Sequence, residues 1–320
     1  MARLFIATPA RPGARTGNLH TAQRWARLLR RGGHRVEVGT TWSGQACDVL
    51  IALHARRSHD SVRAWRRARP EGGLVVVLTG TDLYKDLPRS KEAWASLALA
   101  DRIVVLQDHA PTLLPAPLRR KTDVVFQSAA PTARSAPPKH RFRVCVVGHL
   151  REEKDPFRAA AALARIPGDL PVEVVQVGGA LSPEMAGIAL RHAAQDARYR
   201  WTGSVTHARA LRWMASSHLL VVSSLMEGGA NVIAEAARIG TPVLASRMSG
   251  NLGMLGRRYP GYFPVGDEKA LARLLRRAAT DPAWMRSLGR SLRERRGLFA
   301  PASEQRALLG VVRRATSGAR

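Results

Sequence analysis

HLLVVSSLMEGGANVIAEAARIGTPVLAS, residues 218–246, is the stretch that decides the fold. It opens with an apolar run typical of a buried strand (218–223), passes through a loop with a glycine pair, and continues as an alanine-rich segment. Gly240, which suits a left-handed helix C-cap, and a proline then lead into a second apolar run (241–246). The pattern predicts a strand, a helix over about 231–239 and a second strand.

The loop before this predicted helix contains groups that suit a phosphate. After Glu227, this loop continues through Gly228, Gly229 and Ala230 to Asn231. Glycines let the backbone approach a ligand closely, and the free N–H groups and dipole of a helix start favour an anion. Glu227 stands ahead of the helix, and Glu235 lies one turn inside it, on the face of Asn231. Two such carboxylates can meet sugar hydroxyls on either side of a diphosphate, and solvated surface charges are the alternative interpretation.

Short apolar runs alternate with amphipathic segments along the chain, which predicts parallel sheets covered by helices. The expected strands are 3–8, 35–40, 48–53, 74–79, 102–106 and 123–127, then 143–148, 172–179, 198–203, 218–224 and 241–246. Between the two sets, the proline-containing segment 128–141 has no apolar periodicity and is typical of a linker. We therefore expect an α/β protein with two Rossmann-like, doubly wound domains facing a cleft, where such folds bind ligands.

The composition favours a globular protein with anionic partners. The 320 residues include 51 Lys and Arg against 24 Asp and Glu, a formal net charge of +27. Such a surplus suits phosphates, nucleotides, nucleic acid or a membrane surface, although solvated helix faces explain it equally well. The basic segments RAWRRAR (63–69) and SLRERRGLF (291–299) lack the interleaved aromatic residues of a nucleic-acid platform. We therefore expect no nucleic-acid partner.

The two cysteines, Cys47 and Cys145, lie in or beside apolar runs. Their spacing suits neither a zinc site nor a disulfide framework, which indicates buried thiols in a reducing compartment. The N-terminal apolar stretch is too short for a signal peptide, and no segment approaches the roughly eighteen apolar residues of a membrane span. We expect a cytoplasmic protein without stable insertion in a membrane.

Polar residues at strand ends in the first half form a second candidate site. In ATPARPGARTGN (7–18), a glycine-containing loop leads into a helix that starts near Thr16, Gly17 and Asn18. The residues that follow two further strands are His54, Arg56, Arg57, Thr79, Thr81, Asp82 and Lys85. Strand ends of this kind lie at the ligand-binding edge of a parallel sheet. Because the set is polar and strongly basic, it indicates a small anionic ligand.

The EGG loop, the glutamate eight positions on and the following GTPVLAS resemble the nucleotide-sugar signature of GT-B glycosyltransferases of the family 4 type. The resemblance spans the whole chain. It implies that Glu227 lies near the donor sugar, that Glu235 binds the ribose, and that the backbone between them holds the diphosphate. It also implies an N-terminal acceptor domain (1–135), a C-terminal nucleotide-sugar domain (136–290) and a C-terminal helix (291–320) that crosses back to the first domain.

A basic pair is expected after the first strand of the second domain, in VCVVGHLREEKDPFRAA (144–160). By the resemblance, Lys154 contacts the diphosphate, His149 replaces the usual arginine, and Arg151 supplies the guanidinium, with an acceptor contact as the alternative for His149. A departing diphosphate gathers negative charge that cations and a helix N-terminus must stabilise when no metal assists. No DxD metal triplet is present, so we expect neither a metal nor a cofactor. The remaining expected donor contacts are Gly17 and Asn18.

Seven segments together are similar to a small branch of these transferases, the selenosugar synthases of selenoneine biosynthesis. They are TGN, LHARRS, TGTDLYKD, GHLREEKDPFRAA, RYRWTG, EGGANVIAEA and PGYFPVGD. The similarity implies a UDP-sugar donor, UDP-N-acetylglucosamine or UDP-glucose, and selenophosphate as acceptor, with release of UDP and phosphate. It implies catalytic roles for Glu227, Lys154, Arg151 and His54, of which His54 positions the acceptor.

Two alternatives remain open at this point. An ordinary family 4 transferase acting on a hydroxyl or a lipid would share the second domain, but it would leave LHARRS and TGTDLYKD unexplained. A nucleic-acid binder would explain the net charge of +27, but it would not need Glu227, Glu235 or Lys154.

Overall fold

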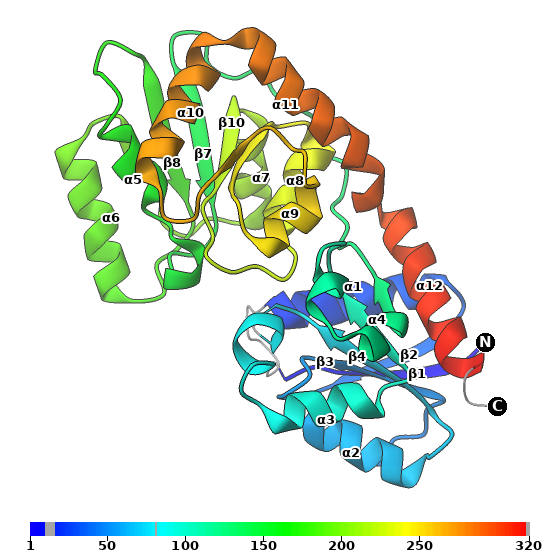
Figure 1. The fold of residues 1–320 in the computed structure, drawn as a ribbon. Helices are drawn as coiled ribbons and strands as arrows, with labels where there is room; N and C mark the ends of the chain where they lie inside the picture. The colour runs from blue at the N-terminus through cyan, green and yellow to red at the C-terminus, as the bar shows by residue number, and fades with distance from the viewer. Residues whose placement is uncertain (10–16, 81, 318–320) are drawn as a thin grey trace. The chain divides into compact units, whose positions relative to one another are not determined.

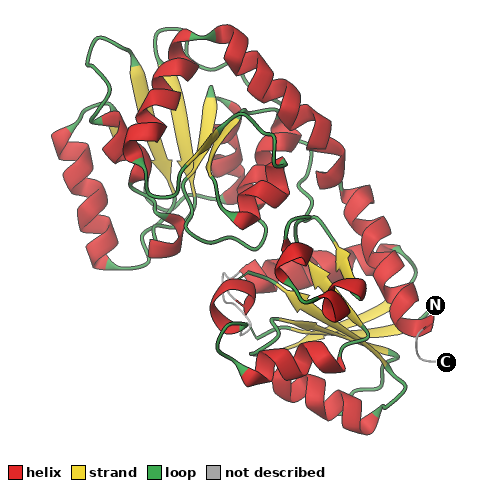
Figure 2. Ribbon diagram, in the orientation of Figure 1, coloured by secondary structure: helices red, strands yellow, loops and turns green. Residues whose placement is uncertain are grey.

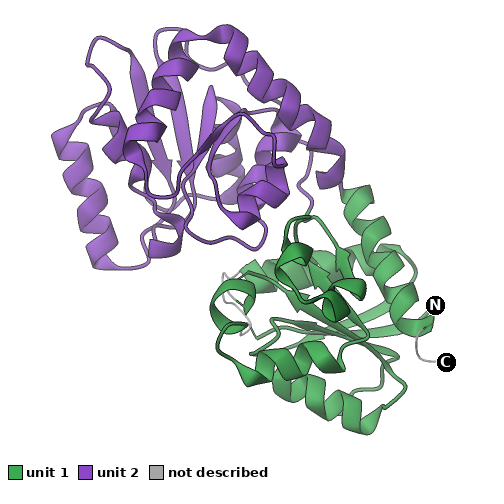
Figure 3. Cartoon of the chain, viewed as in Figure 1, with its two compact units in different colours: residues 1–127, 301–320 green, residues 128–300 purple. Residues whose placement is uncertain are grey.

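The computed structural model describes residues 1–9, 17–80 and 82–317. The chain forms two compact units, residues 1–127 with 301–320 (unit 1) and residues 128–300 (unit 2), as Figure 3 shows. Each unit contains a six-stranded parallel sheet with helices on both faces (Figures 1 and 2). The expected α/β class with two parallel, doubly wound sheets is therefore confirmed.

Unit 1 alternates strands and helices. Its elements are β1 (Arg3–Ala7), α1 (Gly17–Arg31), β2 (Arg35–Gly39), β3 (Val49–Leu53), α2 (His59–Ala68), β4 (Gly73–Leu78), the π-helical turn η1 (Asp82–Asp86), α3 (Lys91–Leu99), β5 (Arg102–Val105), η2 (Ala110–Leu113), α4 (Ala116–Arg120), β6 (Thr122–Val124) and α12 (Pro301–Ser317). The strand order is β2-β1-β3-β4-β5-β6. From β1 the chain continues to β2 at one edge of the sheet, and from β3 it continues toward β6 at the other edge. The direction in which strands are added therefore reverses between the neighbouring strands β1 and β3.

The continuous apolar runs of unit 1 follow from burial on both faces of the sheet. Successive side chains of a strand point to opposite faces. In β1, Phe5 and Ala7 join the core under α2 and α3, whereas Leu4 and Ile6 join the core under α1 and α12. The four central strands β1, β3, β4 and β5 therefore need apolar residues at consecutive positions.

Helix α12 belongs to unit 1 although it lies at the far end of the chain. Leu308 and Val311 pack into the core with α1. Glu304, 1% exposed, accepts from Trp25 Nε1 at 2.8 Å and from Arg24 Nε at 3.1 Å. A buried carboxylate with these two donors fixes the helix against α1.

Unit 2 has its own run of elements. They are β7 (Phe142–Val147), η3 (Glu152–Lys154), α5 (Arg158–Leu163), β8 (Val172–Val177), α6 (Pro183–Gln195), β9 (Tyr199–Trp201), α7 (His207–Ala215), β10 (Leu219–Val222), α8 (Asn231–Ile239), β11 (Val243–Ser246), α9 (Ser249–Leu255), β12 (Tyr262–Phe263), α10 (Glu268–Thr280), α11 (Pro282–Arg295) and η4 (Arg296–Phe299). Within this unit the strands run β9-β8-β7-β10-β11-β12, the 3-2-1-4-5-6 order of a dinucleotide-type sheet. Helix α8 spans the predicted residues, and Gly240 ends it with φ 92°. The local prediction for this stretch is confirmed.

Some boundaries differ from the expectation. The irregular segment 128–141 has neither helix nor strand, but it groups with unit 2, so the division falls at 127/128 rather than 135/136. Residues 291–295 continue α11 in unit 2, and the return to unit 1 starts at Pro301. Cys47 and Cys145 are buried free thiols, as expected. None of the helices in the described ranges combines the length and apolar character needed to cross a membrane.

Candidate functional site

The strand order of unit 2 brings two loops together. β7 and β10 are neighbours, and the chain continues from them toward opposite edges of the sheet. Ligands of such sheets bind beyond the carboxyl ends of the strands at this switch point. The loops that leave β7 (148–155) and β10 (223–230) flank this position. They contain most of the donor residues expected from the sequence.

Lys154 and Glu227 meet at this switch point. The Lys154 ammonium contacts Glu227 Oε1, and Ser224 Oγ donates to the same oxygen at 2.9 Å. The side chains of the pair are 21% and 10% exposed, so they are accessible to a ligand but largely removed from bulk water. Lys154 ends the short turn η3, and Asp155 follows it with φ 44°. The cation expected to bind a diphosphate is thus held by a carboxylate counter-ion.

A hydrogen bond from a side chain to the backbone joins the loop after β7 to the loop after β10. Ser223 Oγ donates to the carbonyl oxygen of Lys154 at 3.1 Å. On the other side, a Cβ added to Gly250 in α9 would lie 2.0 Å from the carbonyl oxygen of Glu227. Only a glycine fits this close approach. Glu227 is therefore positioned by its main chain as well as by its side chain.

The start of α8 presents backbone N–H groups. Gly228 is buried and Gly229 half-buried, and the N-cap residue Ala230 supplies no side-chain acceptor. Asn231 is the first helical residue. The first N–H groups of a helix have no partner within the helix, and together with the helix dipole they favour an anion. This loop and helix start can therefore bind phosphate oxygens.

Glu235 lies one turn into α8 and is paired with a residue that the sequence did not indicate. His207, the first residue of α7, places Nε2 2.8 Å from Glu235 Oε1. The hydrogen bond to Glu235 raises the pKa of His207, against the opposing effect of burial. Glu235 is 14% exposed, so it is not the solvated surface charge of the alternative interpretation.

His149 and Arg151 both have exposed side chains in the loop after β7. Within the described part of the chain, neither side chain forms a hydrogen bond or ion pair. Their positions in the same loop as Lys154 allow either to face a ligand at the switch point. His149 lines a small pocket at the switch point together with Lys154, and Arg151 is not among the residues of that lining.

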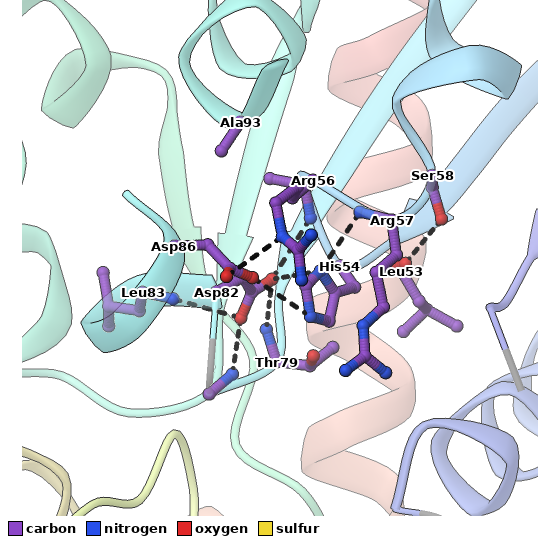
Figure 4. Close-up of polar contacts among 12 residues, drawn as sticks. Leu53, His54, Arg56, Arg57, Ser58, Thr79, Asp82, Leu83, Asp86 and Ala93 are labelled. Carbon is purple, nitrogen blue, oxygen red and sulfur yellow. Dashed lines mark hydrogen bonds and ion pairs between the residues drawn. The ribbon is translucent and has the colours of Figure 1, made fainter. Parts of the chain in front are cut away.

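The basic cluster of unit 1 lies beyond the carboxyl ends of the neighbouring strands β3 and β4, and Figure 4 shows its polar contacts. His54 follows β3 with φ 75°, an uncommon value for a residue with a side chain. Its Nε2 lies 3.4 Å from Asp86 Oδ2, and Nδ1 accepts from the N–H of Arg57 at 3.4 Å. Burial lowers the pKa of His54, in agreement with a neutral ring that accepts at Nδ1 and donates at Nε2. Asp86 in turn accepts from Arg56 Nε at 3.0 Å.

Two of the residues expected on the acceptor side are buried: Asp82, expected to contact the acceptor, and His54, expected to position it. Asp82 is 0% exposed, and its carboxylate accepts from the backbone N–H groups of Ala55, Thr79, Gly80 and Leu83 at 2.8–3.2 Å. It joins the loops after β3 and β4, so it organises the site instead of contacting a ligand. His54 is 1% exposed, so its ring can affect a ligand only through its neighbours. Polar side chains at strand ends are not all accessible, because the turns themselves need acceptors.

The accessible part of the cluster is an open hollow of about 690 Å³. Its lining includes Arg56, Lys85 and Arg89, with Asp86 and Glu92 as the acidic members. Asp86 is engaged by Arg56 and His54, and Glu92 accepts from Ser90 at 2.7 Å. The lining therefore contains three cationic side chains against two acidic ones, and both acidic ones already have partners.

Four other expected residues do not line this hollow. Arg57 is exposed and extends on the other side of His54 from Asp86 (Figure 4), and Thr79 is half-buried. Gly17 and Asn18 begin α1, as expected. Thr16 and Thr81 lie outside the described residues.

Sequence reasoning missed several residues of these two sites. They are Ser224, His207 and Gly250 in unit 2, and Asp86 and Arg89 in unit 1. Arg89 lies four positions after Lys85 in the sequence. This short separation from a residue of the predicted basic set was the signal that could have indicated it. The other four depend on contacts between distant segments or on loop geometry. No group of three or more His, Cys, Asp or Glu side chains that could hold a metal ion occurs in residues 1–9, 17–80 and 82–317.

Comparison with known proteins identifies the class and the family. Two Rossmann-like units with parallel six-stranded sheets constitute the GT-B fold, one of the folds of glycosyltransferases. The family model described as "Glycosyl transferases group 1" matches residues 131–295, just over half of the chain. The chain therefore belongs to the group 1 glycosyltransferases.

Solved structures share the whole fold at low sequence identity. HepE of Anabaena in complex with UDP has a TM-score of 0.78 and 16% identity, covering 98% of this chain and 100% of that one. HepE with UDP-glucose gives a TM-score of 0.75 at 15% identity, with the same coverage. Sucrose-phosphate synthase of Thermosynechococcus elongatus gives 0.74 at 19% identity, covering 97% and 98%. The search of curated proteins found no match.

Proposed function

We propose that this glycosyltransferase transfers a sugar from UDP-N-acetylglucosamine or UDP-glucose to selenophosphate, forming a carbon–selenium bond and releasing UDP and phosphate. The donor half rests on the group 1 family and on the site at the switch point of unit 2. The similar fold of HepE, solved with UDP and with UDP-glucose, supports a uridine nucleotide. In this proposal Lys154 and the start of α8 bind the diphosphate, Glu227 lies beside the sugar, and Glu235 binds the ribose.

The hollow in unit 1 is the observation that supports an anionic acceptor. A small oxyanion has no apolar surface to bury, so its capture depends on charge-assisted hydrogen bonds. Arg56, Lys85 and Arg89 line the hollow, and arginine is the best side chain for this purpose. His54 holds Asp86, which in turn holds Arg56 Nε and leaves the terminal nitrogens of that guanidinium for a ligand. In this proposal His54 positions Arg56 and does not remove a proton.

The proposed reaction has two steps. Selenium of selenophosphate attacks the anomeric carbon, the bond from that carbon to the diphosphate oxygen breaks, and the electron pair leaves with UDP. Lys154, Arg151 and the α8 N–H groups stabilise the charge that gathers on UDP. Water then attacks phosphorus, the phosphorus–selenium bond breaks with its electron pair on selenium, and phosphate and the 1-selenosugar are released. Because the selenium is already anionic, the first step needs no general base.

The direct test is incubation of the purified protein with each UDP-sugar and selenophosphate. We expect release of UDP and phosphate together with a selenium-containing sugar in the mass spectrum. Inorganic phosphate should compete with selenophosphate and not with the UDP-sugar. If UDP is released only when a sugar or lipid alcohol is present, the protein is an ordinary family 4 transferase and the selenium proposal fails.

A further inference from the structure

The ribose end of the donor site contains an ion pair between two helices. His207 begins α7, and the side chain of Thr206 caps that helix by accepting from the N–H of Arg209 at 3.3 Å. The cap fixes the helix start from which the imidazole reaches Glu235 on α8, with Nε2 2.8 Å from Oε1. The two residues are 28 positions apart, and each is held by its own helix.

The pair leaves one carboxylate oxygen of Glu235 available. His207 engages Oε1, and within the described residues the carboxylate has no other hydrogen-bond donor. A glutamate side chain loses rotamer freedom when it is fixed, so an unsupported Glu235 would have to be ordered by the ligand itself. A carboxylate already held at Oε1 presents Oε2 in one direction.

The ion pair contributes little to folding. His207 keeps 72% of its side-chain exposure, and exposed pairs of this kind stabilise a protein only slightly. Glu235, in contrast, is 14% exposed, so its carboxylate is largely removed from bulk water. The small effect on stability makes a role in ligand binding separable from a structural one.

We propose that His207 is a positioning residue for nucleotide recognition: by donating Nε2–H to Oε1 it turns the Glu235 carboxylate so that Oε2 accepts from a ribose hydroxyl of the donor. The inference rests on the proposed function, in which Glu235 is the ribose ligand. It adds a second residue, on a different helix, that acts on the nucleotide only through Glu235. The raised pKa of His207 keeps its ring nitrogens protonated to a higher pH, in agreement with a donor at Nε2.

The test is a double-mutant cycle on UDP affinity, measured by calorimetry. We expect His207→Ala to weaken UDP binding by about 2- to 5-fold and to raise the KM for the UDP-sugar more than it lowers kcat. In the Glu235→Ala background, His207→Ala should have no further effect, because the residue that it positions is gone. The loss should also disappear with 2′,3′-dideoxyuridine diphosphate, which has no ribose hydroxyls. His207→Gln, which keeps a side-chain N–H donor, should restore part of the affinity.

The matched control is His140→Ala, at an exposed histidine before β7 in the same unit, which should bind UDP like the parent protein. If Glu235→Ala weakens UDP binding and His207→Ala does not, the inference is overturned while the proposed function stands. If His207→Ala weakens the dideoxy analogue equally, or still acts without Glu235, it works by another route and the inference is again overturned. If Glu235→Ala itself leaves UDP binding unchanged, the ribose role within the proposed function fails.

Discussion

Replacing Lys154 by alanine removes the cation at the centre of the unit 2 switch point. In the structure its ammonium contacts Glu227 Oε1, and the side chain is 21% exposed. The proposed reaction places a leaving diphosphate at this position, with more negative charge on it in the transition state than in the bound donor. The substitution should therefore lower kcat more than it weakens binding of the donor.

The size of the effect on kcat follows from the partial burial of Lys154 and from its charge interaction with the leaving diphosphate. Two unit charges about 4 Å apart interact by about 4 kcal/mol at an effective dielectric constant of about 20, the value for sites near a protein surface. Water that enters the space of the missing side chain recovers part of this energy, because Lys154 is not fully buried. We expect a net loss of about 2.7–4 kcal/mol, equivalent to a decrease in kcat of about 10²–10³.

The assay is UDP release at saturating UDP-sugar and acceptor. Lys154→Arg keeps the charge and should recover much of the rate, and Lys269→Ala, at an exposed lysine of α10, should behave like the parent protein. The melting temperature of each variant shows whether the fold survives. A kcat within threefold of the parent value for a folded Lys154→Ala variant would refute the placement of the leaving group beside Lys154.

Four further outcomes follow from the structure. Arg151→Ala should lower kcat about as much as Lys154→Ala, measured by UDP release. Arg56→Ala should raise the KM for selenophosphate with little effect on the KM for the UDP-sugar, measured in separate titrations of the two substrates. Gly250→Ala would place a Cβ 2.0 Å from the carbonyl oxygen of Glu227, so the loop that contains Glu227 would have to shift. Donor binding should therefore weaken, measured by UDP calorimetry. Glu304→Ala leaves a buried indole donor of α1 without its acceptor and should cost about 1–3 kcal/mol of stability, measured by urea unfolding.

Each of these four has a result that contradicts it. Near-normal activity of Arg151→Ala with a severe loss in His149→Ala would reassign the second cation to His149. A change in donor KM for Arg56→Ala would place that side chain in the donor site. Parent-like UDP affinity in Gly250→Ala would show that the loop moves freely. A parent-like urea midpoint for Glu304→Ala, equal to that of a control at the exposed Glu294, would mean that water satisfies the indole.

The central strands of both sheets were predictable because burial on both faces imposes a nearly continuous apolar run on each of them. Strands β2, β6 and β9 are only partly buried and mix apolar with polar residues, and β12 has only Tyr262 and Phe263, too few residues to give a periodic signal. The loop and helix after β10 were predictable for a different reason: Gly240 and Pro242 mark the end of the helix and the start of the next strand in the local sequence.

Two signals in the sequence indicated the candidate site residues. Arg56 was indicated by its position after a strand end, and Lys154, Glu227 and Glu235 by the resemblance to the family 4 signature. The burial of individual side chains was not predictable from the sequence. The sequence of a strand end gives no sign that the Asp82 carboxylate will accept hydrogen bonds from four backbone N–H groups. Nor does it indicate that His207 will reach Glu235 from another helix. These contacts depend on how helices and loops pack.

The position of α12 sets an order of events during synthesis. Residues 128–300 make up the whole of unit 2, so this unit needs no segment from elsewhere in the chain to complete its core. Unit 1 does, because the apolar face of its sheet under α12 stays uncovered until residues 301–317 emerge. The first-made sheet of this protein is therefore the last to be finished, and for that interval its exposed valines and isoleucines are a surface for chaperones or for aggregation.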